Sequence, residues 1–243
     1  MNPGIQQDVT RLTFRSFLSP LIRALLVLLV LLLLLSAVAA NGLENHQDIR
    51  AHLIGAQEIL EAEQRLSILG YWTGPVDGVF DSGSRHALVA FQKVEGRKRT
   101  GKLTSEELQA LRTALRPLPQ YTDAGHVEID LQRQVLFLVD ETATVTHILP
   151  VCTGNEGSYV DHGQVHRAHT PRGKFKVLRK IRGVRISSLG FLYYPNYIYE
   201  GIAIHGSWAM AAYPSSHGCI RIPMFAAKAF SELVPLGTEV NVY

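Results

Sequence analysis

The segment Pro214-Ser215-Ser216-His217-Gly218-Cys219-Ile220-Arg221-Ile222-Pro223 determines how the second half of the chain is interpreted. In an extended stretch, Cys219 and Arg221 project to the same face. Proline fits the first turn of a helix, and the sequence predicts a helix over 223–234 with Phe225, Ala229 and Leu233 on one face. The segment therefore predicts a thiol that lies directly before a helix.

The position of Cys219 suits a nucleophile. Gly218 lets a substrate carbonyl approach the backbone, and the N–H groups of Gly218 and Cys219 are candidate donors to the oxyanion that forms on attack. The helix start favours the thiolate. Arg221 either lowers the thiol pKa, holds a substrate carboxylate or makes an ordinary surface ion pair. His205 and His217 are the two candidates for the base that a cysteine nucleophile needs.

Strand patterns surround this segment. Val127, Ile129 and Leu131 alternate with polar residues, and further β-rich runs lie at 135–139, 144–151, 174–178, 201–205 and 239–242. Sheet therefore dominates residues 125–243, and 223–234 is the helix predicted there.

Helical patterns occupy an earlier region, 56–115. Three short helices are predicted there, and the apolar positions of the second and third are Ala87, Ala90, Phe91, Val94, Leu108, Leu111 and Leu115. Thr104 and Glu107 are spaced as a capping box. Residues 116–124 contain two prolines and predict a stiff linker. The chain is thus predicted to be α+β, with a small helical domain before a mainly β domain.

The helical region resembles a peptidoglycan-binding domain, a three-helix module. The resemblance rests on LGYWTGPVDGVF at 69–80, AFQ at 90–92 and TGKLTSEEL at 100–108, and covers about 57–112. Tyr71, Phe80 and Phe91 are interpreted as core residues. Trp72 is the candidate for ligand contact because it lies in a turn.

The second half is similar to the L,D-transpeptidase catalytic domain, a family of cysteine enzymes that cross-link the bacterial cell wall. The similarity runs from about His126 to Tyr243 and rests on AIHGS at 203–207, SSHGCIRI at 215–222 and TPRGKF at 170–175. It implies a role for each matching position: Cys219 as the nucleophile, His205 as the general base, the Gly206 carbonyl as the group that orients the imidazole, His217, Gly218 and Arg221 as pocket residues, and Ser216 as part of the motif.

The resemblance also implies the reaction. Cys219 would attack the carbonyl of the third residue of a peptidoglycan stem peptide and release D-alanine, and an amine of a second stem would then attack the thioester. Water as the acceptor would give an L,D-carboxypeptidase, and an envelope protein would give attachment of that protein to peptidoglycan. Neither step needs a metal or another cofactor. We expect a monomer with stem peptides and glycan as partners.

Two hypotheses of other classes remain. His162, His166 and His169 have a spacing that permits a zinc site, and a zinc peptidase would use some of them with His205 and His217, although no helical HExxH pattern is present. A non-catalytic wall-binding protein is the other. The second cysteine, Cys152, is predicted to be a small buried strand residue, with a disulfide to Cys219 as the alternative.

The N-terminus predicts export. Residues 24–35 are all Ala, Leu or Val, preceded by Arg11, Arg15 and Arg23 and followed by small residues at 36–40. This order is typical of a signal peptide over 1–40, or of an uncleaved anchor in the inner membrane. The protein is therefore expected in the periplasm or cell wall. Beyond residue 40 the net charge is only +1, which argues against a nucleic-acid partner.

Overall fold

A computed structural model describes residues 54–243 together with residues 25, 28–32 and 34. Ile54 to Tyr243 forms one compact unit. Those seven earlier residues are helical with exposed side chains. Within the described parts of the chain, no helix has the length and apolar character that crossing a membrane requires. The predicted signal also depends on residues 11, 15, 23 and 36–40, which lie outside the described residues.

The three helices predicted in the first region are present as α2 (Ala56–Ile68), α3 (Ser82–Val94) and α4 (Ser105–Thr113). Asp81 caps α3 by accepting a hydrogen bond from the Ser84 amide at 2.9 Å. Thr104 caps α4 by accepting from the Glu107 amide at 3.3 Å, which is one half of the predicted capping box, whereas the Glu107 carboxylate accepts from Arg97 Nε. The prediction for Leu115 is wrong, because α4 ends at Thr113 and Leu115 is exposed.

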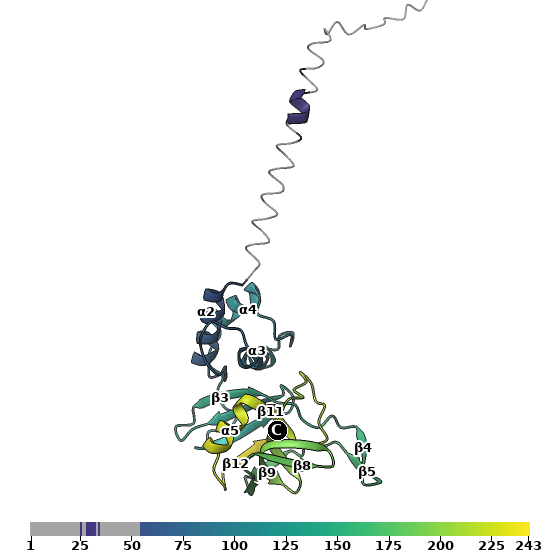
Figure 1. The fold of residues 1–243 in the computed structure, drawn as a ribbon. Helices are drawn as coiled ribbons and strands as arrows, with labels where there is room; N and C mark the ends of the chain where they lie inside the picture. The colour runs from purple at the N-terminus through teal and green to yellow at the C-terminus, as the bar shows by residue number, and fades with distance from the viewer. Residues whose placement is uncertain (1–24, 26–27, 33, 35–53) are drawn as a thin grey trace, which may run out of the picture. The chain divides into compact units, whose positions relative to one another are not determined.

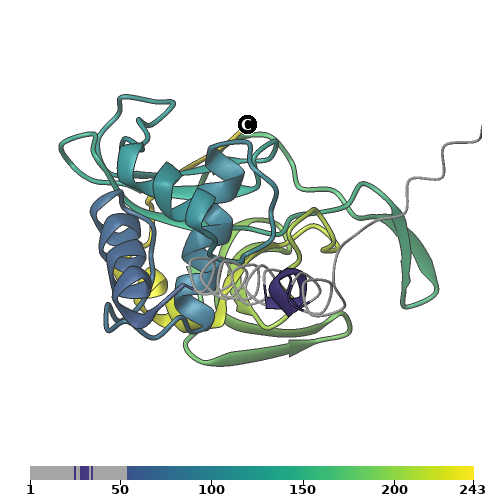
Figure 2. The same cartoon turned by 90° about the horizontal axis from the view of Figure 1, so that it is seen from above.

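Two five-stranded sheets and one hairpin form the second region (Figure 1). The first sheet has the order β3-β2-β1-β12-β6, with β1 (His126–Asp130), β2 (Val135–Val139), β3 (Val145–Pro150), β6 (Gly173–Lys176) and β12 (Glu239–Val242). The second has the order β11-β10-β9-β7 with β8 on β9, and consists of β7 (Arg179–Lys180), β8 (Val184–Ser187), β9 (Gly190–Tyr199), β10 (Ile202–Ser207) and β11 (Ile220–Pro223). The hairpin pairs β4 (Ser158–Asp161) with β5 (Gln164–Arg167), and it projects from the rest in both views (Figures 1 and 2).

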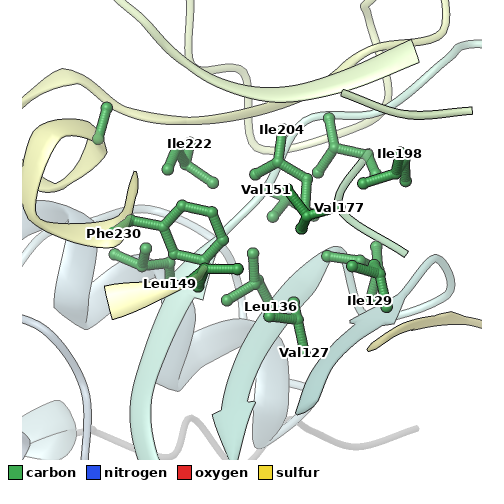
Figure 3. Packing of buried hydrophobic residues seen from close by; sticks show 14 of the residues in the cluster. Val127, Ile129, Leu136, Leu149, Val151, Val177, Ile198, Ile204, Ile222 and Phe230 are labelled. Carbon is green, nitrogen blue, oxygen red and sulfur yellow. The ribbon is translucent and has the colours of Figure 1, made fainter. Parts of the chain in front are cut away.

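The first sheet has an apolar core on each face. Leu136 faces the second sheet, and it packs with Val127, Leu149, Ile204, Ile222 and Phe230 in the cluster shown in Figure 3. The neighbouring Val135 and Phe137 point the other way, into a cluster with residues of α2, α3 and α4. One face of the first sheet therefore packs against the three helices, and its other face packs against the second sheet.

The final helix, α5 (Met224–Leu233), matches the predicted position but not the predicted face. Its buried residues are Ala226, Ala227, Phe230 and Ser231, whereas Phe225 and Leu233 are exposed. A Cβ on Gly206 of β10 would lie 2.6 Å from the Ala227 Cβ. The helix thus approaches β10 closely through its small residues, and the bulky Phe225 and Leu233 lie outside that contact.

The helical region is joined to the sheet by hydrogen bonds as well as by packing. The backbone of Gly70 and Trp72 bonds to Ile148 of β3. Lys93 of α3 is buried, and its Nζ donates to the carbonyls of Gln134 and Val151 at 3.0 and 2.8 Å. The Trp72 ring packs against the core and lies 4.3 Å from the His147 ring, so it contributes to this junction.

Candidate active site

A cleft of about 580 Å³ lies on the second sheet. Among its lining residues are five that the sequence predicted for the site: His205, Ser216, His217, Cys219 and Arg221. β10, β11 and the loop before β11 supply all five. The fold therefore brings together the two predicted motifs that are separated along the chain.

Strand register explains how Cys219 and His205 meet. β10 and β11 run parallel, with His205 opposite Arg221, so Cys219 lies beside Ala203. Because side chains alternate along a strand, these four residues project to the same face, toward the cleft. The opposite face carries the buried Ile204, Ile220 and Ile222 of the core. From the strand spacing and the rise per residue, a diagonal pair on adjacent parallel strands has its Cα atoms roughly 8 Å apart, so the Cys219 and His205 side chains can approach each other on this face.

His205 is held as a neutral imidazole. Its side chain is buried, and Nδ1 lies 3.0 Å from the Gly206 carbonyl. A carbonyl only accepts, so Nδ1 carries the hydrogen and Nε2 keeps a lone pair that can take a proton. Burial lowers the pKa of His205 to about 4; the Gly206 carbonyl opposes this shift and Arg221 adds to it. His205 can therefore act as a base across the neutral pH range.

Cys219 is half-buried and packs beside Leu192, Tyr197 and Ala203. Burial raises the pKa of the Cys219 thiol, and this effect exceeds the lowering by the Ala203 amide and by Arg221. Arg221 thus lowers the thiol pKa, which is one of the roles expected for it, but burial has the larger effect. With a neutral thiol beside a neutral imidazole, the arrangement suits proton removal during attack rather than a preformed ion pair.

The loop before Cys219 is fixed by two hydrogen bonds of Ser216. The buried Ser216 Oγ accepts from the Gly218 amide at 3.0 Å and donates to the Cys219 carbonyl at 2.6 Å. The Gly218 N–H, one of the two predicted oxyanion donors, is therefore engaged within the loop. Gly218 has φ +136°, and a Cβ there would lie 2.8 Å from the His169 carbonyl oxygen, so only glycine fits without a shift.

His217 is exposed at the cleft and contacts the β4–β5 hairpin. Its ring lies 4.6 Å from the Tyr159 ring, measured between centroids, and His166 lies on Tyr159 at 5.5 Å. Residues 155–169 contain this hairpin, and its Tyr159 and Asp161 line the cleft.

His162, His166 and His169 each have a different partner or environment in the structure. His162 is exposed in the hairpin turn, His166 lies on Tyr159, and His169 Nδ1 is 2.9 Å from a Glu156 carboxylate oxygen. In the described residues, no three His, Cys, Asp or Glu side chains gather in a group that could hold a metal ion.

Sequence reasoning missed two of the three arginines that line the cleft. Arg179 of β7 and Arg185 of β8 line it together with Arg221, whereas Asp161 is the acidic residue in its lining. The Arg179 guanidinium stacks on the Tyr197 ring at 3.8 Å, and Ser188 Oγ donates to Asp161 at 3.0 Å. The density of basic residues over 174–185 was the available signal.

Cys152 is buried, as predicted, and both cysteines are free thiols. Its backbone pairs with Arg221 through two hydrogen bonds, and its Sγ lies 3.0 Å from Ser215 Oγ. Cys152 thus supports the strand that follows Cys219, and it is not part of the cleft lining.

Comparison with known proteins agrees with both resemblances. Residues 124–242 match the family model of the L,D-transpeptidase catalytic domain, and residues 55–111 match that of a peptidoglycan binding domain. No match was found among curated proteins.

Solved structures include similar proteins. The crystal structure of an L,D-transpeptidase from Xylanimonas cellulosilytica is 37% identical, with a TM-score of 0.72, over 76% of this chain and 93% of that chain. An L,D-transpeptidase from Stackebrandtia nassauensis is 22% identical over 78% of this chain and 92% of that chain, with a TM-score of 0.46. From the identity to the Xylanimonas enzyme and its coverage, together with the matched catalytic domain, the chain belongs to the L,D-transpeptidase family.

Proposed function

We propose that this cell-wall transpeptidase joins the third residues of two peptidoglycan stem peptides through a thioester on Cys219. The observation that carries the proposal is the shared cleft, in which His205 presents an unprotonated Nε2 on the same face as the Cys219 thiol. Peptidoglycan as the substrate agrees with the family matches of both regions. The proposal also includes the domain limits: a peptidoglycan-binding domain over 56–115, a linker over 116–124 and a catalytic domain over 125–243.

The first half-reaction forms an acyl-enzyme. Sγ of Cys219 attacks the carbonyl carbon of the third residue while His205 Nε2 takes the thiol proton. The tetrahedral intermediate collapses, the bond to the amine of the terminal D-alanine breaks, and the imidazolium returns its proton to that amine. The Gly206 carbonyl holds the ring through Nδ1 in both protonation states, which keeps Nε2 aimed at the reacting atoms.

The second half-reaction transfers the acyl group. A side-chain amine of a diamino acid on a neighbouring stem gives up a proton to His205 and attacks the thioester carbonyl. The carbon–sulfur bond then breaks, and the imidazolium returns the proton to the leaving Cys219 sulfur. Water in the same position would release a free tripeptide, and an amine of an envelope protein would attach that protein to the wall. The acceptor therefore determines which product forms, while the first half-reaction stays the same.

We also propose that the protein is exported, because of the residues that precede the compact unit. The apolar run at 24–35 would direct the chain to the periplasm or cell wall, either as a cleaved signal or as an anchor in the inner membrane. A site outside the cytoplasm agrees with the peptidoglycan-related domains. The helical region would then keep the cleft close to the wall.

The test compares C219A with C152A in the purified full-length chain. With stem tetrapeptides, the wild type should form an acyl-enzyme and cross-linked dimers that mass spectrometry detects. C219A should lose both by roughly a thousandfold or more, because no other group supplies the nucleophile. C152A is the matched control, since Cys152 is a free thiol outside the cleft. Cross-linking by C219A would refute the assignment, and free tripeptide as the product would favour the carboxypeptidase.

A chelator separates the proposal from the zinc peptidase hypothesis. The thiol mechanism predicts that activity persists after equilibration with a chelator. Loss of activity that added zinc restores would overturn the proposal in favour of a metal-dependent peptidase.

A further inference from the structure

We infer that Thr170 is a positioning residue for the nucleophile: its buried hydroxyl fixes the Gly218–Cys219 peptide so that the Cys219 N–H faces the oxyanion. The inference rests on the proposed acyl transfer by Cys219. Thr170 does not line the cleft and lies 49 residues before the thiol, so its effect would pass through the Gly218–Cys219 peptide.

The hydrogen bonds of Thr170 define the direction of this contact. The side chain is 2% exposed. Thr170 Oγ1 accepts from the Gly154 amide at 2.9 Å and donates to the Gly218 carbonyl at 2.6 Å. A hydroxyl has a single hydrogen, and an amide can only donate. The Thr170 hydrogen is therefore committed to the Gly218 carbonyl.

Peptide geometry carries this constraint to Cys219. In a planar trans peptide, the carbonyl of one residue and the N–H of the next point in opposite directions. The Gly218 carbonyl points at Thr170, which lines a separate cavity of about 290 Å³. The Cys219 N–H consequently points away from that cavity. The N–H groups of Gly218 and Cys219 were the two predicted donors to the oxyanion. Because Ser216 Oγ accepts from the Gly218 N–H, the Cys219 N–H is the remaining candidate.

Close packing keeps the peptide in this orientation. The chain at His169 lies directly against Gly218, as the 2.8 Å from a Cβ at 218 to the His169 carbonyl oxygen shows. Gly154, whose amide bonds to Thr170, is also paired with Ser216 as an isolated bridge. Thr170 thus bonds to Gly218 in the loop before Cys219 and to Gly154, which pairs with Ser216 of the same loop.

The experiment compares two reactions of Cys219 in the full-length chain. Acylation by a stem tetrapeptide passes through an oxyanion, whereas alkylation by iodoacetamide at a saturated carbon does not. T170V keeps the shape of the side chain and removes the hydroxyl. We expect acylation to slow by about tenfold to a hundredfold. Alkylation should stay within about twofold of the wild type, because it depends on the thiolate alone. Intact-protein mass spectrometry follows both rates.

T170S and T153V are the controls. T170S retains the hydroxyl and should restore the wild-type ratio of acylation to alkylation. Thr153 is equally buried, and its hydroxyl accepts from Gln134 Nε2 at 2.7 Å, so T153V removes a neighbouring hydroxyl from a different bond. Its ratio should stay unchanged.

Several outcomes would overturn the inference. These are an unchanged ratio in T170V, an equal loss in T153V, or a loss in T170S that matches T170V. If T170V does not fold, T170A replaces it as the variant without a hydroxyl. A wild-type chain that forms no acyl-enzyme would refute the proposed function itself, which distinguishes the two failures.

Discussion

Burial opposes ionisation at both members of the Cys219–His205 pair. It lowers the pKa of His205 to about 4 and raises the pKa of the Cys219 thiol. Both groups are therefore neutral near pH 7. We therefore expect acyl transfer at this pair to depend on proton transfer in the transition state, as in serine hydrolases, and not on a preformed thiolate.

This ionisation state predicts different pH profiles for two reactions. Acylation of Cys219 by a stem peptide, measured as kcat/KM, should change little from about pH 5 to 7 and fall below a midpoint near pH 4, where His205 becomes protonated. Alkylation by iodoacetamide needs the thiolate, so its rate should keep rising above the usual range of cysteine pKa values. A high alkylation rate that is already constant at neutral pH would indicate a preformed ion pair and contradict this account.

At the level of elements, the sequence predicted what consecutive residues determine. The motifs at 203–207 and 215–222 identified His205 and Cys219, strand alternation located β1 and β12, and a β-rich apolar run located β2. β9, the longest strand, was missed, because Pro195 interrupts a run that otherwise has the aromatic residues of a strand. Arg179, Arg185 and Tyr159 were missed because their place in the cleft depends on how β4, β7 and β8 fold over it.

The arginines of β7 and β8 predict how the cleft selects its substrate. Arg179, Arg185 and Arg221 line it together with the carboxylate of Asp161, so we expect the cleft to favour anionic peptides. R185Q should raise KM about fivefold for a stem peptide with free carboxylates and leave kcat nearly unchanged, since an exposed charge pair contributes about 1 kcal/mol. Added salt should weaken wild-type binding more than that of the variant.

R182Q is the matched control for R185Q. Arg182 lies in the turn between β7 and β8, is exposed and does not line the cleft. Its substitution removes the same charge a few residues away. Equal increases in KM for R182Q and R185Q would indicate a general charge effect and refute a specific contact of Arg185 in the cleft.

At the level of the whole molecule, the helices and the sheets meet at a buried lysine. Lys93 Nζ donates to the carbonyls of Gln134 and Val151, and Val151 precedes Cys152, which pairs with Arg221 of the active site. Burial lowers the pKa of Lys93 to about 7, with a further lowering by Arg99 and a small opposing effect of Cys152. The junction between the two regions therefore contains an amine that titrates near neutral pH.

Because the pKa of Lys93 differs between the folded and the unfolded chain, the free energy of unfolding depends on pH, and proton linkage gives the sign of this dependence. Between about pH 7 and 10 the unfolded chain keeps the Lys93 proton that the folded chain has lost, so the free energy of unfolding rises with pH. This contribution approaches about 1.4 kcal/mol per pH unit. Other groups also titrate in this range, but their contributions are common to the wild type and a Lys93 variant. The difference between the two therefore isolates Lys93.

K93M tests this assignment by urea unfolding of the full-length chain from pH 6 to 9.5. Methionine has a similar length and no charge, so the wild type should gain stability relative to K93M as pH rises above 7 and show no relative change below it. K98M, which removes an exposed lysine just after α3, should follow the wild type at every pH. If K93M and the wild type show parallel pH dependence, Lys93 keeps its proton in the folded chain. The amine would then join the helices to the sheet as a permanent cation, and the junction would be indifferent to pH.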